Sequence, residues 1–370
     1  MLIAYWTRYK IILSIDRVIV QMNLLNKKVI LISVKIIITA VLIFFIIKQV
    51  HWHDYSIIDD NGQKSICKGV LSSIKGANLY FLSCSVLCLI VTQFITGYRW
   101  QQMLMIQQIQ VKFMKIINLT FLANFLCLVL PGLFGGDLVK AYLVARQTPQ
   151  KAHILVSVFF DRLFGLAGFT IMATVMLFIV WATGALNQEA IYTPALTVAV
   201  VVGGIAIGTP LLLSSRLRRY LYLHKIYDLL PLNRYIAQAG EAIDIYRRKW
   251  RCMLSMIGVT LVSHVVAIFS VILVGISLGL SMEWYLYFLY VPLVIIISAV
   301  PLSPGSVGLT EKLYLIYMAS AGNSSEVLAL AVLVRITFVL SNLPGAFVAM
   351  LGPKISREDI LQAKLEAEEF

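Results

Sequence analysis

The segments PGLFG (residues 131–135) and PGSVG (residues 304–308) share one pattern, and each lies between apolar stretches. An arginine inside an apolar run follows each segment at the same spacing: Arg162 lies 27 residues after Gly135, and Arg335 lies 27 residues after Gly308. An acid and a base lie between each segment and its arginine. Because these features recur in the same order, the sequence predicts a duplicated unit with a duplicated polar site.

The composition indicates a membrane protein. Hydrophobic residues make up 60% of the 370 residues, only 13% are charged, and the mean hydropathy is +0.86, whereas a soluble domain has about 25% charged residues. Several apolar runs have the ~20 residues that a helix needs to cross a ~30 Å hydrocarbon core. Helices are expected rather than strands, because these runs are continuously apolar and do not alternate with polar residues.

We therefore predict an all-α polytopic membrane protein with about eight transmembrane helices and two re-entrant hairpins at the Pro-Gly segments. Two shorter helices, at about 135–147 and 308–320, follow the Pro-Gly segments. The predicted spans are 29–48, 79–97, 116–131, 152–182, 193–214, 252–280, 285–301 and 326–350.

The basic loops predict the orientation, because cytoplasmic loops are enriched in lysine and arginine. The N-terminus, loop 98–115 with Arg99, loop 215–251 and the C-terminal tail are basic and are assigned to the cytoplasm, and loop 49–78 is assigned to the outside. The two Pro-Gly segments then become hairpin tips that enter from opposite faces. This is an inverted repeat, a build common in secondary transporters. The alternative, in which both hairpins cross the membrane completely, stays open.

Three regions are expected along the chain: a basic cytoplasmic segment at 1–28, an integral membrane domain at 29–352, and a cytoplasmic tail at 353–370. Residues 1–21 are a start-site artefact if Met22 is the true start. Between Arg216 and Arg251 lie nine Lys/Arg and three acids, and no nucleic-acid motif accompanies them, so loop 215–251 is expected to contact anionic lipid. An amphipathic helix after Pro231 either packs beneath the spans or lies at the membrane interface.

The two arginines are the strongest candidates for function. Each lies about ten residues into its predicted span, which corresponds to a depth of ~15 Å. An arginine at the membrane centre costs on the order of 3 kcal/mol even on the mildest scale, so it should face a partner or a wet cavity. One interpretation is an ion pair that only ties helices together. The other is an anchor for a lipid headgroup, because a guanidinium binds phosphate with two parallel hydrogen bonds.

The charged neighbours of these arginines extend the candidate site. Asp137 and Lys140 share one helical face, whereas Glu311 and Lys312 do not, and Asp161 is expected to reach another helix. The acids either cap helix N-termini or form a proton or cation site coupled to transport. The candidate substrate-binding residues are Arg162, Arg335, Lys140, Asp137, Glu311, Asp161 and Lys312.

The Pro-Gly segments have a mechanical explanation. A hairpin tip at membrane depth turns tightly, glycine permits the positive φ that such a turn needs, and proline suits a first helical turn. The helix that follows directs free N–H groups inward, which suits an anion. The hairpin backbone residues are Pro131, Gly132, Gly135, Gly136, Pro304, Gly305 and Gly308.

Other chemistry finds little support in the sequence. No Walker motif, dinucleotide fingerprint, zinc-ligand spacing or nucleophile elbow occurs, so we expect no catalytic residue, no cofactor and no metal. The five cysteines are odd in number and lie mostly in apolar runs, where they are expected to be packing residues.

The two motif sets resemble the membrane domain of the lysylphosphatidylglycerol synthases, a family also called flippase-like. Most of the chain, from about residue 30 to 352, is covered by the resemblance. The chain departs from the family pattern at Lys140, where arginine is usual, and at Asp161, where glutamate is usual. The matching residues are Asn124, Leu130, Pro131, Gly132, Gly135, Gly136, Asp137, Lys140, Asp161, Arg162, Pro301, Pro304, Gly305, Gly308, Glu311, Arg335 and Gly345.

The resemblance implies the half of such proteins that translocates lipid, without the aminoacyl-transfer domain. We expect a flippase in the cytoplasmic membrane of a prokaryote, with both termini in the cytoplasm. Its cargo would be an anionic phospholipid or a polyprenyl-phosphate-linked lipid, held at the midplane by Arg162 and Arg335. The alternatives are a membrane-embedded glycosyl- or aminoacyl-lipid transferase and a non-catalytic partner of a separate lipid synthase.

Overall fold

The computed structural model describes residues 37, 39–58, 64–129, 135–146, 148, 150–213, 233–300 and 302–351. Several sequence predictions lie outside these residues. They are the basic N-terminal segment 1–28, the start of the first predicted span, Pro131 and Gly132, residues 215–232 of the basic loop, and the tail 353–370.

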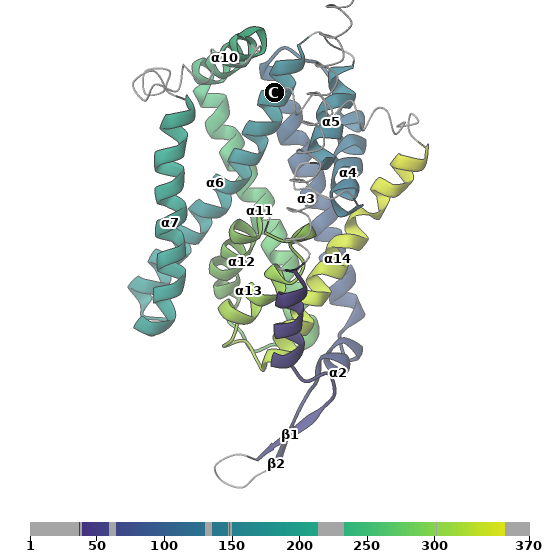
Figure 1. Cartoon of the computed structure of the whole chain (residues 1–370), viewed down its shortest axis with the longest axis vertical. Coiled ribbons are helices and arrows are strands. Elements are labelled where there is room, and N and C mark those ends of the chain that lie inside the picture. The colour runs from purple at the N-terminus through teal and green to yellow at the C-terminus, as the bar shows by residue number, and fades with distance from the viewer. Residues whose placement is uncertain are drawn as a thin grey trace, which may run out of the picture.

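The described chain is mostly helical (Figure 1). A helix occurs in each predicted apolar range, and the first is Thr39–Gln49. The short helices predicted after the Pro-Gly segments are α5 (Gly135–Ala145) and α13 (Leu309–Tyr317). The other helices at predicted spans are α3 (Leu79–Ile106), α4 (Phe113–Val129), α6 (Lys151–Thr183), α7 (Gln188–Leu213), α11 (Trp250–Leu278), α12 (Trp284–Ser298) and α14 (Ser324–Leu351).

Helices α3, α6, α11 and α14 are long and apolar enough to cross a membrane. Large apolar side chains stay exposed on the outside of the bundle, and Val200 (67% exposed), Ile207 (74%) and Phe347 (64%) are examples. A water-soluble protein rarely presents so many exposed apolar side chains together. The chain is therefore an all-α membrane protein whose outer surface suits a lipid environment.

Two regions differ from the prediction. Helix α3 continues to Ile106, so Arg99 lies inside a helix and not in the loop predicted at 98–115. Its side chain is buried at 5% exposure and paired, which removes the penalty that would otherwise end an apolar helix near a charge. Region 49–78 contains two antiparallel strands, β1 (Tyr55–Ile58) and β2 (Lys64–Cys67), followed by the short helix α2 (Val70–Lys75).

The helices pack in a reciprocal pattern. Eight helices form two sets of four, α3 to α6 and α11 to α14. Every contact between two of these eight helices has a counterpart when α3 is exchanged with α11, α4 with α12, α5 with α13 and α6 with α14. The second helix of each set packs against the last helix of the other, as α4 does against α14 and α12 against α6. In Figure 1, α5 lies near the upper end of the bundle and α13 in its lower half. The two sets thus share one packing pattern, and their short helices lie in opposite halves of the bundle.

Buried amides join α3, α4 and α14. The Nε2 of Gln93 donates to Oδ1 of Asn342 at 2.6 Å, and the Nδ2 of Asn124 donates to Oε1 of Gln93. Nearby, a Cβ on Gly345 would lie 2.2 Å from the carbonyl oxygen of Phe121. Helices α4 and α14 therefore touch backbone to backbone, and a buried polar chain spans the same region.

Helix α10 (Asn233–Arg248) is the amphipathic helix predicted after Pro231. Ala242 and Tyr246 are buried, and the Tyr246 hydroxyl donates to the Met103 carbonyl of α3 at 3.1 Å. The side chain of Gln107 donates to the Ala242 carbonyl at 2.9 Å. Its described C-terminal half thus packs against the membrane helices, in agreement with one of the two predicted placements.

Replacing Gly345 by alanine should destabilise the fold, because the new methyl group would overlap the Phe121 backbone and push α14 away from α4. Overpacking of this kind costs about 1–3 kcal/mol. We expect a lower Tm for Gly345→Ala in detergent micelles. Gly258→Ala in α11 is the matched control, since a Cβ there meets no atom within 4 Å. Equal Tm values for the two variants would contradict the close contact.

Candidate functional site

The first polar cluster forms where α5 meets α6. Arg162 of α6 donates from Nε to Oδ2 of Asp137 at 2.5 Å, and its Nη2 contacts the same carboxylate. Asp137 lies in the first turn of α5 and is buried at 5% exposure. Helix α5 comes this close to α4 because residue 136 is glycine, since a Cβ there would overlap the Ala123 carbonyl of α4. The partner that a deep arginine needs is thus supplied by the helix after the Pro-Gly segment.

Lys140 lies one turn further along α5 on the same side. Its Nζ is 3.9 Å from Oδ1 of Asp137 and 3.9 Å from the centroid of the Trp100 ring of α3. Both side chains are buried, with Lys140 at 5% and Trp100 at 0% exposure. The aromatic face stabilises the ammonium by a cation–π interaction. The shared face of Asp137 and Lys140 that the sequence predicts is present in the structure.

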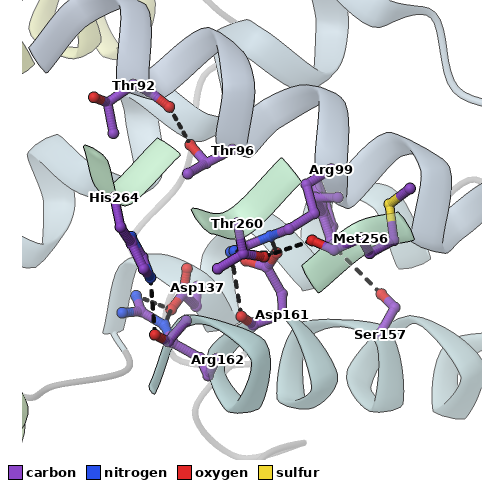
Figure 2. A network of polar contacts seen from close by, with 12 residues as sticks. Thr92, Thr96, Arg99, Asp137, Ser157, Asp161, Arg162, Met256, Thr260 and His264 are labelled. Carbon is purple, nitrogen blue, oxygen red and sulfur yellow. Dashed lines mark hydrogen bonds and ion pairs between the residues drawn. The ribbon is translucent and has the colours of Figure 1, made fainter. Parts of the chain in front are cut away.

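A buried ion pair lies beside this cluster. Arg99 of α3 donates from Nε to Oδ1 of Asp161 at 2.9 Å and from Nη1 to the Thr260 hydroxyl of α11 at 2.8 Å. Its Nη2 donates to the Asp161 carbonyl at 3.2 Å. Figure 2 shows Arg99 between Asp161 and Thr260, and Arg162 beside Asp137. Asp161 therefore reaches a different helix from its neighbour Arg162, as expected for adjacent helical positions.

The second cluster forms where α13 meets α14. Arg335 donates from Nε to Oε1 of Glu311 at 2.6 Å, from Nη1 to the Gly305 carbonyl at 3.2 Å, and from Nη2 to the Ser306 carbonyl at 3.3 Å. The second oxygen of Glu311 accepts the Gly308 N–H at 2.7 Å, so this acid caps α13 and also pairs with the arginine.

The second Pro-Gly turn uses the left-handed backbone region. Gly305 and Gly308 have φ values of +59° and +79°, and Ser306 has a φ of +54°. Only glycine enters this region at little cost. The Ser306 hydroxyl donates to the Ser298 carbonyl at 2.7 Å, and its own carbonyl accepts from Arg335, so its strained backbone is fixed on both sides.

Lys312 does not join the second cluster. Its Nζ donates to the side chain of Gln49 at 2.5 Å, on the helix Thr39–Gln49. Because Lys312 is the immediate neighbour of Glu311, it projects from a different face of α13. The candidate residues thus fall into a first cluster of Asp137, Lys140 and Arg162, the adjacent Asp161, a second cluster of Glu311 and Arg335, and a separate Lys312.

Sequence reasoning missed Arg99 as a member of the site. The available signal was the apolar character of the chain around it, since residues 79–106 form one long, mainly apolar stretch. Its partner Asp161 is 62 residues away along the chain, so spacing rules for a single helix do not find the pair. Trp100 and Thr260 are contributed in the same way by distant helices.

Both clusters pair a cationic side chain with a carboxylate. Guanidinium and ammonium groups recognise phosphate and carboxylate. Among the described residues, no group of three or more His, Cys, Asp or Glu side chains is arranged to hold a metal ion.

Comparison with protein families identifies the chain. The model of the lysylphosphatidylglycerol synthase transmembrane region matches residues 30–345, which include both Pro-Gly segments and both arginines. The chain belongs to this family. The resemblance noted in the sequence is therefore confirmed, and the protein is a membrane domain of a family connected with lipid synthesis or flipping. No match is found among curated protein sequences.

Neutralising one partner of the Arg99–Asp161 pair should destabilise the protein, because the other charge would stay buried and unpaired. Losing one member of a buried pair costs about 3–5 kcal/mol. We expect Asp161→Asn and Arg99→Met each to lower the Tm in detergent clearly. The double variant should lose less than the sum of the two single losses, because no unpaired charge is left. Additive losses would show that the two side chains do not interact.

Proposed function

We propose that this protein moves a lipid with an anionic headgroup across the membrane. The two arginine–carboxylate pairs, Arg162–Asp137 and Arg335–Glu311, would be the polar groups that the headgroup meets inside the bilayer. The lipid would be an anionic phospholipid or a polyprenyl-phosphate-linked lipid. Its acyl chains would stay in the surrounding lipid while the headgroup passes along the protein.

The observation that carries this proposal is a pair of partly exposed arginines at matching depths in two apolar helices. Arg162 lies eleven residues after Lys151, the first residue of α6, and Arg335 lies eleven residues after Ser324, the first residue of α14. Both positions are about 16 Å along their helices. The side chains are 45% and 33% exposed, although each is paired. A charge that stays accessible at such a depth is typical of a transport pathway.

The reciprocal packing supports an inverted repeat. In this proposal α4–α5 and α12–α13 are re-entrant hairpins that enter from opposite faces, and eight helices are membrane segments. Their opposite placement agrees with Figure 1, where α5 lies toward the end of the molecule that includes α10, and α13 lies nearer the strands β1 and β2. A repeat of this kind allows alternating access by rocking one half against the other.

The orientation follows from the basic residues. We place α10 and the rest of loop 215–251 in the cytoplasm because positive charge is retained on that side, and we place the strands outside. Both termini are then cytoplasmic. For a member of this family we propose the cytoplasmic membrane of a prokaryote as its location.

The test is transbilayer movement of fluorescent phosphatidylglycerol in vesicles that contain the full chain. Dithionite added outside bleaches only outer-leaflet probe, so the decay of the remaining fluorescence reports movement. We expect Arg162→Gln and Arg335→Gln each to slow movement at least about tenfold, because a desolvated headgroup loses a charge-assisted contact.

Arg247→Gln is the matched control, because Arg247 is 80% exposed on α10 and its only described ion pair is a surface contact with Asp244. This variant should move lipid at the unmodified rate. Full rates in both Arg162→Gln and Arg335→Gln, with the same elution profile as the unmodified protein, would refute the proposed site. Rates equal to those of protein-free vesicles for phosphatidylglycerol and polyprenyl-phosphate probes would refute the proposed function.

A further inference from the structure

The two polar clusters differ in charge although their helices pack alike. One helical turn after its acid, the first repeat has Lys140 and the second has Tyr314. Immediately before its arginine, the first repeat has Asp161 and the second has Val334. Divergence at these positions means that equivalent places in the two repeats offer different chemistry to a ligand.

The first cluster has more positive than negative charge. Three cations, Arg99, Lys140 and Arg162, are in contact with two carboxylates, Asp137 and Asp161. Lys140 is also near enough to Asp161 for their charges to interact. Among the described residues no further carboxylate joins this set, so the cluster has an excess of one positive charge.

Lys140 is the cation with the weakest pairing. The carboxylate oxygen of Asp137 is 3.9 Å from its Nζ, which is too long for a hydrogen bond, and Arg162 makes the close contacts with that carboxylate. The remaining described contact of Lys140 is the Trp100 ring, which accepts no ordinary hydrogen bond. A charge that is 95% buried and incompletely paired is unfavourable without a counter-ion.

The second cluster is balanced. Arg335 faces one carboxylate, Glu311, and two of its other N–H groups donate to the carbonyls of Gly305 and Ser306. Tyr314 is neutral and buried at 2% exposure. This arginine therefore fastens its own Pro-Gly turn to α14, and its charge is matched by that of Glu311.

We propose that the headgroup binds most tightly at the first cluster, with one negatively charged group, a phosphodiester, between Lys140 and Arg162. A phosphodiester has a single negative charge, which matches the excess charge of the cluster. The Arg162 side chain is 45% exposed and would contact the ligand directly, and the buried Lys140 would add a second positive charge nearby. The second cluster, whose charges balance, would meet the headgroup more weakly. This inference rests on the proposed function, because it assigns the tighter binding of the cargo to one of the two repeats.

The test measures binding of dioctanoyl phosphatidylglycerol to the full chain in maltoside micelles by titration calorimetry. Removing the excess charge with Lys140→Met should weaken binding about tenfold, and Lys140→Arg should keep the affinity within about twofold. Asp137→Asn should instead strengthen binding, because the cluster gains a further net positive charge and Arg162 loses its competitor. If these side chains served only to stabilise the fold, Lys140→Met and Asp137→Asn would both weaken binding.

A surface arginine provides the matched control. Arg247→Gln should keep the affinity within about twofold, because Arg247 is 80% exposed on α10 and belongs to neither cluster. Dioctanoyl glycerol, which has no phosphate, should not bind. Inorganic phosphate in place of lipid distinguishes the source of the anion, and we expect it to bind far more weakly than the lipid. Equal binding of inorganic phosphate would overturn the assignment to a lipid.

Three results would overturn the inference: unchanged affinity in Lys140→Met, weaker binding in Asp137→Asn, or equal losses in Lys140→Met and Arg247→Gln. Failure of the proposed function gives a different result. In that case the binding pattern would hold while lipid movement in vesicles stayed at the protein-free rate. If Lys140→Met left lipid movement unchanged, the proposed translocase function would stand and the proposed phosphodiester site would be wrong.

Discussion

A guanidinium inside an apolar helix must be paired, and much of this architecture satisfies that requirement. Arg162 and Arg335 each find a carboxylate on the short helix that follows a Pro-Gly segment. That short helix must then lie against the long helix, which requires a tight turn before it. Gly136 permits the close approach in the first repeat, and the positive φ values of Gly305 and Gly308 form the turn in the second.

Much of the fold could be predicted from the sequence, because membrane helices are long and continuously apolar. The sequence also predicted the short helices after the Pro-Gly segments and the shared helical face of Asp137 and Lys140. It predicted that Lys312 lies on a different face of its helix from Glu311. These features depend on local periodicity alone. The sequence did not predict contacts between residues that are far apart along the chain.

The ion pair of Arg99 with Asp161 shows this limit. A charge near the end of an apolar run is normally interpreted as the start of a loop, and only a partner on another helix lets the run continue. The same holds for the ring of Trp100 beneath Lys140 and for the buried amides of Gln93, Asn124 and Asn342. Their side chains meet only after the helices have packed.

The chain of buried amides makes the two reciprocal helix contacts mechanically unequal. Between α4 and α14, Gln93 of α3 bridges Asn124 and Asn342, and the backbones touch at Gly345. Between α6 and α12, the described residues form no side-chain hydrogen bond, and both helices contribute apolar residues, such as Ala173 and Leu289, to one buried hydrophobic cluster. Sliding α12 along α6 exchanges one apolar neighbour for another, whereas sliding α14 along α4 breaks buried hydrogen bonds. The α6–α12 interface can therefore slide at a lower cost than the α4–α14 interface, which the buried hydrogen bonds hold in one register.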